Sequence, residues 1–145
     1  MKKWLKFLLV LGFLGIVAVF LIYKFYINKP HPDFEAAVPE YVISANDLFD
    51  QYVKDKSSAD KLYTGKVIQI EGILSKKDVN DTNVYLIFVY NEGMFGDEGI
   101  RCRLLPKYNR LATEEIEINS DIEIKGFCAG YNETDVILDK CSILD

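Results

Sequence analysis

Three cysteines and one histidine are the residues of this 145-residue chain best suited to covalent or metal chemistry. Cys102, Cys128 and Cys141 all lie in its C-terminal third. A cysteine nucleophile needs a nearby base that takes its proton, and a zinc site commonly uses Cys-x-x-Cys pairs or histidines held by the fold. The only histidine, His31, lies in a Pro-His-Pro sequence, where we expect a solvated side chain. The spacing therefore argues against cysteine catalysis and against a metal site, and it implies no cofactor.

The same cysteines leave two structural interpretations open. A hairpin centred near Asn132 would place Cys128 opposite Val136, so that Cys141 would lie five residues further along, about 16 Å away. A disulfide needs Cα atoms within about 7 Å of each other, which disfavours Cys128–Cys141 and leaves Cys102–Cys141 across neighbouring strands. Three cysteines would still leave one unpaired. The alternative is that all three are small buried apolar side chains.

Clustered Asp, Asn and Glu residues could offer oxygen ligands to Ca²⁺. Residues 78–83 read Asp-Val-Asn-Asp-Thr-Asn, and Asp97 is followed by Glu98. The first cluster lacks the glycine and the distant glutamate of an EF-hand loop. Asp and Asn favour turns for their own reasons, because their side chains bond to nearby backbone amides. We therefore assign no metal ligand to these segments.

The first element that positions these residues in the cell is an apolar segment at the N-terminus. Phe7 to Tyr23 is an uncharged run of 17 residues, which would span about 25 Å as a helix against a hydrocarbon core of about 30 Å. Lys6 and Lys24 can close the difference by snorkelling. A cleaved signal peptide would end at a small-x-small site, and this run ends in bulky residues. We expect an uncleaved transmembrane anchor that contacts the membrane through residues 4–23.

The distribution of charge predicts the orientation of this anchor and restricts the partners of the domain that follows it. Three lysines precede the apolar run and two follow it, so the positive-inside rule places the N-terminus in the cytoplasm and the domain in the periplasm or outside the cell. The first 29 residues hold five of the 17 basic residues and none of the 22 acidic ones, which leaves a formal charge of −10 on the rest. Such a domain repels a polyanion, so nucleic acid is disfavoured as a partner.

The chain is predicted to consist of an anchor (1–29), a linker (30–42) and one globular domain (43–145). Ser44 can cap a helix whose apolar positions recur with helical spacing from Ala45 to Val53. A second helical turn is expected over 57–63. Gly65 can end it in a left-handed conformation.

After Lys66 the sequence pattern changes to that of strands. Alternation and β-branched residues predict strands over 67–72, 84–90, 100–104, 121–128 and 135–144, with a helix over 106–115 and loops over 75–83, 91–99 and 130–134. Five strands with a helix between the third and fourth follow the order of an OB-fold barrel. Gly72 and Gly126 lie inside strands, where glycine permits the sharp bends of a small barrel. The predicted fold class is therefore mainly β, a five-stranded OB-fold barrel preceded by a helix.

Two motifs carry a resemblance to a known family. Ala-Asp-x-x-Tyr-x-Gly-Lys begins at Ala59, and Gly-x-Cys-x-Gly begins at Gly126. Together they resemble the tRNA-anticodon-binding-like OB-fold family of small exported or membrane-anchored bacterial domains, over about Ile43 to Leu144. The resemblance implies a fold rather than an activity, because members are largely uncharacterised. Many members look like lipoproteins, whereas this chain has no cysteine near the end of its apolar run.

The candidate ligand-binding residues are Arg101, Arg103, Tyr85 and Tyr131. The two arginines point the same way from the predicted third strand, and in OB-folds the second and third strands and the adjoining loops form the ligand face. Arginine beside stacking aromatic rings suits single-stranded nucleic acid, and equally an anionic sugar or a protein. The alternative is a solvated pair of arginines that bind nearby carboxylates.

The sequence favours a binding protein over an enzyme, because it shows no nucleophile with a base and no metal cluster. We expect a membrane-anchored extracytoplasmic OB-fold module that recognises a protein, peptide or saccharide of the cell envelope. The alternative is an oligonucleotide-binding OB-fold protein.

Overall fold

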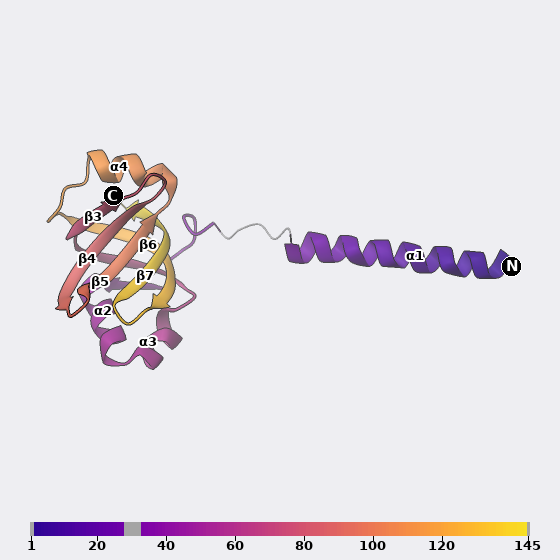
Figure 1. Ribbon diagram of the computed structural model, residues 1–145, viewed down its shortest axis with the longest axis horizontal. Coiled ribbons are helices and arrows are strands. Elements are labelled where there is room, and N and C mark those ends of the chain that lie inside the picture. The colour runs from indigo at the N-terminus through magenta and orange to yellow at the C-terminus, as the bar shows by residue number, and fades with distance from the viewer. Residues whose placement is uncertain (1, 28–32, 145) are drawn as a thin grey trace. The chain divides into compact units, whose positions relative to one another are not determined.

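The computed structural model describes residues 2–27 and 33–144. The chain divides into two compact units, Met1–Pro32 and Asp33–Asp145 (Figure 1). His31, expected to be a solvated linker residue, and the two prolines beside it lie outside the described residues.

The first unit is a single helix. Helix α1 runs over Lys2–Ile22 and continues with wider turns as η1 over Tyr23–Ile27. None of its residues is buried, and it is the only helix among the described residues long and apolar enough to cross a membrane. A membrane anchor and a signal sequence share these properties.

Two short helices open the second unit after strand β1 (Tyr41–Ser44). Helix α2 spans Ala45–Lys54, and its N-terminus is capped by Ser44, whose Oγ accepts a hydrogen bond from the Asp47 amide at 3.1 Å. Helix α3 spans Lys56–Tyr63, and Gly65 follows it with a φ of 83°. The predicted cap, both helices and the left-handed glycine are therefore confirmed.

The domain is built on one seven-stranded sheet with the order β1-β2-β6-β7-β5-β4-β3. The strands after β1 are β2 (Val67–Ile73), β3 (Lys76–Val79), β4 (Val84–Gly93), β5 (Gly96–Leu104), β6 (Asp121–Tyr131) and β7 (Asp135–Leu144). The β1–β2 and β5–β7 pairs are parallel and the other pairs are antiparallel. A short helical segment, η2 (Pro106–Tyr108) and α4 (Asn109–Glu114), separates β5 from β6 as predicted.

The mainly β class is confirmed, but the closed five-stranded barrel is not. Strands β1 and β3 were not predicted, and the hydrogen-bonded sheet is not closed into a barrel. Strands β2 and β3 lie near opposite ends of the strand order, yet only Leu74 and Ser75 separate them in the chain. The Ser75 amide donates to the Ile87 carbonyl of β4 at 3.0 Å, and the Leu74 amide donates to the Ser120 carbonyl at 2.9 Å. These two residues therefore carry the chain from one end of the sheet to the other.

Alternate residues of the strands form the core. Ile68, Ile70, Phe88 and Ile100 are fully buried. Gly72 faces the same side as Ile68 and Ile70, as predicted, and a Cβ there would lie only 3.0 Å from Ala45 Cβ. Helix α2 thus packs close against β2, which gives this glycine a packing role beyond any role in bending the strand.

All three cysteines are free and fully buried. The predicted pairing of Cys128 with Val136 is wrong, because irregular pairing of β6 with β7 shifts the register and places Cys128 opposite Leu138. Cys141 pairs with Leu104 of β5. Burial raises the pKa of the Cys141 thiol, and the neighbouring Cys102 thiol raises it further. In the structure the three cysteines are therefore small apolar side chains of the core, which was the second of the two interpretations.

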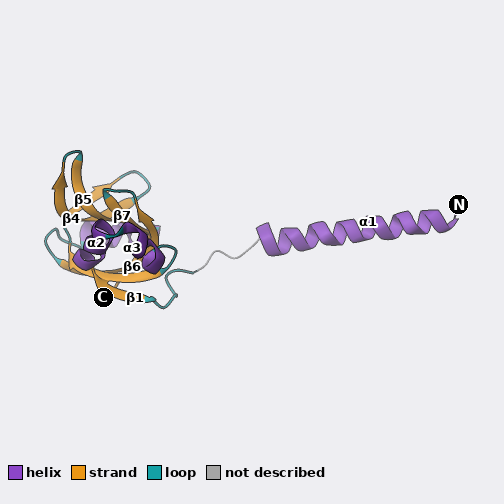
Figure 2. Ribbon diagram, turned by 90° about the horizontal axis from the view of Figure 1, so that it is seen from below, coloured by secondary structure: helices purple, strands orange, loops and turns teal. Residues whose placement is uncertain are grey.

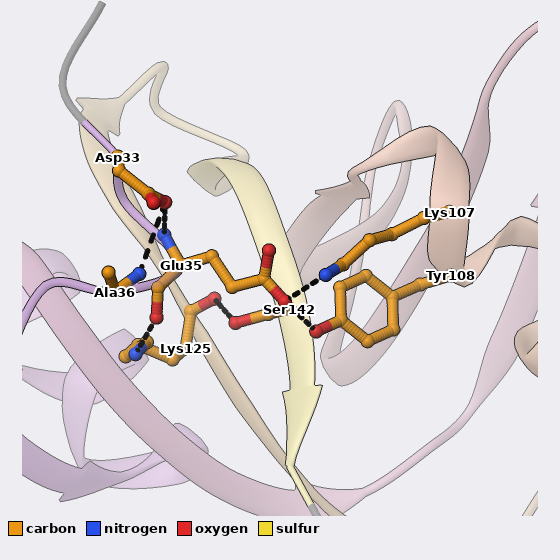
Figure 3. Close-up of polar contacts among 7 residues, drawn as sticks. All are labelled: Asp33, Glu35, Ala36, Lys107, Tyr108, Lys125 and Ser142. Atoms are coloured by element: carbon orange, nitrogen blue, oxygen red, sulfur yellow. Dashed lines mark hydrogen bonds and ion pairs between the residues drawn. The ribbon is translucent and has the colours of Figure 1, made fainter.

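A segment just after the undescribed residues is fastened to the domain (Figure 3). Asp33 Oδ1 accepts hydrogen bonds from the Glu35 and Ala36 amides at 3.1 Å each. Lys125 Nζ donates to the carbonyls of Glu35 and Ala37 at 2.5 and 2.9 Å. Residues 33–37, which were predicted to be part of the linker, therefore belong structurally to the domain, and we call them the strap.

The strap is also held by its side chains. The Glu35 carboxylate forms an ion pair with Lys107 and accepts a hydrogen bond from the Tyr108 hydroxyl at 2.5 Å. These two contacts hold the pKa of Glu35 below its ordinary value. The ring of Phe34 packs against Phe127, with the ring centroids 5.0 Å apart.

Candidate functional site

A cavity of about 330 Å³ lies where β3, β4 and β5 meet the turn between β6 and β7. Its lining includes Lys76, Ile87, Phe95, Asp97, Glu98, Arg101, Thr134 and Asp135. Two further hollows of the domain, about 370 and 500 Å³, contain none of the four predicted ligand-binding residues. The cavity with Arg101 is therefore the candidate site that sequence and structure share.

Strand alternation brings three of the predicted residues together. On β5, Ile100, Cys102 and Leu104 are buried, so Arg101 and Arg103 lie on the opposite face. Tyr85 of β4 pairs directly with Arg103, and Ile87 pairs with Arg101. Tyr85, Arg101 and Arg103 thus share one face of the β4–β5 ladder, as the sequence predicted.

Both arginines face carboxylates. Arg103 binds Asp139 of β7 through two hydrogen bonds, from Nε at 2.6 Å and from Nη2 at 2.7 Å. This contact raises the pKa of Arg103 above its ordinary value. Arg101 lies 3.8 Å from both Asp78 and Asp135. Each guanidinium charge is thus already matched by at least one carboxylate of the same domain.

Asp135 is the most enclosed charged group of the site, with only 12% of its side chain exposed. Burial raises the pKa of this carboxyl, while Arg101 opposes the shift. The residue is positioned by Asn132, whose Oδ1 accepts hydrogen bonds from the Thr134 and Asp135 amides at 3.1 and 2.7 Å. The tight turn between β6 and β7 therefore fixes Asp135 at the edge of the cavity.

Tyr131 lies apart from the arginines. Its ring packs against Tyr52 of α2, with the centroids 5.7 Å apart, and Lys56 Nζ lies 5.9 Å from its ring centroid. Its hydroxyl donates to the Glu133 carbonyl at 3.0 Å. Tyr131 consequently packs against the helical end of the core, and it is not among the residues that line the cavity.

The cavity itself carries mixed charge with an acidic excess. Its lining holds three carboxylates, Asp97, Glu98 and Asp135, and two cations, Lys76 and Arg101. Lys76 forms an ion pair with Asp97. The Glu98 carboxylate accepts a hydrogen bond from the Asn91 side chain at 2.8 Å and has no cation partner among the described residues. The site can therefore accept hydrogen bonds from a ligand more readily than it can neutralise an anion.

Several of these residues were not predicted to lie at the ligand-binding face, because their segments were expected to be loops. Asp97 and Glu98 lie in β5, within the predicted loop 91–99, and Lys76 lies in β3, within the predicted loop 75–83. Glycines on both sides of Met94-Phe95 were the available signal, since a short hairpin turn often contains glycine. Among residues 2–27 and 33–144, no three His, Cys, Asp or Glu side chains are arranged to hold a metal ion.

Comparison with known proteins agrees with this fold. A family model described as tRNA_anti-like matches residues 1–143. A crystal structure of a lipoprotein from Klebsiella pneumoniae subsp. pneumoniae MGH 78578, described as a candidate nucleic acid-binding protein, superposes with a TM-score of 0.52. It is 14% identical and covers 81% of this chain and 100% of that chain, so this likeness shows the fold alone.

A second structure, of yeast Stn1 and Ten1, is 8% identical and covers 80% of this chain and 68% of that chain. Its TM-score of 0.36 is too low to carry an argument. No curated protein matches the chain.

Proposed function

This chain belongs to the tRNA_anti-like family, and from that premise we propose that it is a membrane-anchored binding module. Its OB-like domain recognises a protein, peptide or saccharide of the cell envelope through the face of Arg101 and Arg103. The module binds and does not catalyse.

The connectivity supports an OB-like domain. Strands β2, β4, β5, β6 and β7, with α4 between β5 and β6, follow the strand and helix order of an OB-fold. The parallel contact of β5 with β7 is the pairing of third and fifth strands expected of that fold. We propose that β2 and β3 act as one bent first strand, which closes the barrel through Leu74 and Ser75.

The observation that carries the choice of ligand is the pairing of the two arginines. A phosphate backbone is bound by cations that are free to replace its counterions, whereas Arg103 is held by Asp139 and Arg101 lies between Asp78 and Asp135. A polyanion would have to displace these carboxylates within a domain that already carries a formal charge of −10. A ligand that has both hydrogen-bond donors and hydrogen-bond acceptors does not have to displace these carboxylates.

The length and composition of α1 support the anchor. We propose that it spans the membrane with the N-terminus in the cytoplasm, so that the domain faces the periplasm or the outside of the cell. Cell fractionation tests the anchor, because the full chain should stay with membranes after an alkaline wash and a chain that lacks residues 2–27 should not. Release of the full chain by that wash would remove the anchor from the proposal.

Parallel binding measurements test the ligand class. The full chain in phosphatidylcholine nanodiscs is used to select binders from a library of random dodecapeptides, and an oligothymidylate long enough to cover an OB-fold is titrated by fluorescence anisotropy. We expect enriched peptides and no saturable oligothymidylate binding at physiological salt. Replacement of Arg101 and Arg103 by alanine should leave the fold intact and weaken the selected peptides.

Two outcomes would contradict the proposal. Equal peptide affinity in the double variant would show that the chosen face is wrong. Saturable oligothymidylate binding that the double variant abolishes would establish the alternative, an oligonucleotide-binding protein.

A further inference from the structure

The hairpin of β4 and β5 extends beyond its neighbours in the sheet (Figure 2). Pairing of β5 with β7 begins at Gly99, and pairing of β4 with β3 involves no residue beyond Ile87. Residues 91–98 pair only within the hairpin, Asn91 with Glu98 and Gly93 with Gly96 among them. We call residues 91–98 the arm.

Two large apolar side chains form the apex of the arm. Met94 is 93% exposed and Phe95 is 95% exposed. Gly96 takes up the positive φ of the turn, at 128°, and a Cβ on Gly93 would lie 2.3 Å from Glu98 Oε1. Polar turn residues normally occupy such an apex. Folding of the hairpin does not need apolar groups at these two positions, so the apex is a candidate contact surface for another molecule.

The surroundings of the apex are acidic. Glu92, Asp97 and Glu98 lie on the arm, which carries no basic residue. Lys76 pairs with Asp97, while Glu92 and Glu98 have no cation partner within the described part of the chain. One side of the arm forms a wall of the cavity, where Phe95, Asp97 and Glu98 meet Asp135 at the start of β7. An apolar surface is thus continuous with a cavity in which carboxylates outnumber cations.

We propose that the arm and the cavity together bind a basic peptide segment of a protein partner. An aromatic or aliphatic side chain of that segment packs on Phe95 and Met94, and an adjacent Lys or Arg enters the cavity beside Glu98. Backbone carbonyls of the same segment accept hydrogen bonds from Arg101 and Arg103, so that loss of the arginines weakens binding even though the segment is basic. This inference rests on the proposed function and names its ligand class. Opposite charge favours this occupant over an anionic membrane surface or a second copy of the acidic domain.

The full chain in phosphatidylcholine nanodiscs and the random dodecapeptide library provide the test. We expect enriched peptides to carry a Lys or Arg next to an aromatic or aliphatic residue. The variant Met94→Ser/Phe95→Ser should weaken the best peptide by about tenfold or more, as loss of a central aromatic contact does, and Glu98→Gln should weaken it as well. Both variants should stay folded by circular dichroism, because the apex side chains are almost fully exposed and glutamine at position 98 keeps an oxygen that can accept the hydrogen bond from Asn91.

Matched control variants remove the same number of exposed apolar side chains or carboxylates at positions outside the arm and the cavity. Val38→Ser/Ile118→Ser also removes two exposed apolar side chains, which are 84% and 51% exposed, and Glu117→Gln removes one exposed carboxylate. Neither control should change the affinity. Equal weakening by controls and test variants would show non-specific attraction to an acidic protein and would overturn the inference.

The remaining outcomes separate this inference from the proposed function. If the enriched peptides carry no positive charge, or if the apex variant binds them as well as the unmodified chain does, the inference of a basic peptide is overturned. The proposed function survives that result if the Arg101/Arg103 double variant still binds the peptides more weakly. If neither variant weakens binding, the inference and the proposed function are both overturned. A Phe95→Trp reporter in a Trp4→Phe background tests the membrane instead. Quenching of that reporter by brominated lipid in nanodiscs would place the apex in lipid and overturn the inference.

Discussion

The thiol of Cys141 occupies the space that a side chain at Gly126 would need. A Cβ built on Gly126 would lie 2.5 Å from Cys141 Sγ and 3.3 Å from the Asp139 carbonyl oxygen. Gly126 lies in β6 and Cys141 in β7, and the register of this antiparallel pair shifts between Lys125 and Phe127. The two strands therefore approach closely at a point where one side carries no side chain and the other carries a small buried one.

Replacement of Gly126 by alanine is expected to lower the free energy of unfolding by about 1–3 kcal/mol, because overpacking a core forces neighbours to move. The double variant Gly126→Ala/Cys141→Ala should lose less than the sum of the two single variants, since the shorter side chain vacates the contested space. Urea denaturation of the four proteins measures the coupling. Strictly additive losses would show that the two residues do not compete.

The Ser44 cap should have a measurable effect on stability. Its hydroxyl satisfies the free amide of Asp47, so Ser44→Ala should lower the free energy of unfolding by about 0.5–2 kcal/mol. Ser44→Asp offers the same acceptor and should retain most of the stability. Urea denaturation compares the three chains, and an aspartate variant as unstable as the alanine variant would argue against capping.

The paired arginines should contribute little to stability. The side chains of Arg103 and Asp139 are 42% and 27% exposed, so solvent screens the pair and Arg103→Ala should lower the free energy of unfolding by at most about 1 kcal/mol. The difference from the unmodified chain should shrink at high salt. Urea denaturation at two salt concentrations checks both statements. Unfolding of the Arg101/Arg103 double alanine variant would contradict them.

Acid should weaken the attachment of the strap through Glu35. Ion pairing with Lys107 and the hydrogen bond from Tyr108 lower the pKa of Glu35 below its ordinary 4.5. Between the lowered pKa and 4.5 the unfolded chain binds more protons, so stability rises with pH there. The contribution of Glu35 is complete above pH 4.5 and disappears as the pH falls through the lowered value.

The variant Glu35→Gln measures this effect. It should be less stable than the unmodified chain at neutral pH, and the difference should vanish in acid. Urea denaturation over a pH series gives the comparison, with Glu115→Gln, at an exposed residue outside the strap, as the control. A difference that stays constant in acid would show that the Glu35 carboxylate does not titrate against Lys107.

Local patterns in the sequence predicted most helices and the inner strands, but not strands β1 and β3 or the arm. Strand β1 is four residues that become extended by pairing with β2, Tyr41 opposite Ile68. Strand β3 is largely polar and depends on β4, Lys76 opposite Ile87. No pattern within β1 reports a partner so far along the chain, whereas β3 pairs with β4 across a short turn but lacks the alternation of a strand. The arm pairs only within itself, and its glycine and acidic residues are typical of a loop.

The candidate site was predictable only along one strand. Alternation on β5 was enough to place Arg101 and Arg103 on one face. The carboxylates that face them come from β3 and β7, and irregular pairing between Cys128 and Gly130 shifts the register of Tyr131 against β7. Pairing of the arginines with nearby carboxylates was one of the two interpretations that the sequence left open, but the sequence did not identify Asp78, Asp135 and Asp139 as those carboxylates. The register shift has no reliable local signal, so the separate position of Tyr131 could not be predicted.

Because all three thiols are buried, their reaction with a reagent can report how often the domain opens. A sulfhydryl reagent in the solvent reaches Cys102, Cys128 and Cys141 only when the strands around them separate. The rate of labelling under native conditions therefore measures how often the sheet opens, with no added probe. Mass spectrometry of the labelled peptides would resolve that frequency at three positions, one each on β5, β6 and β7.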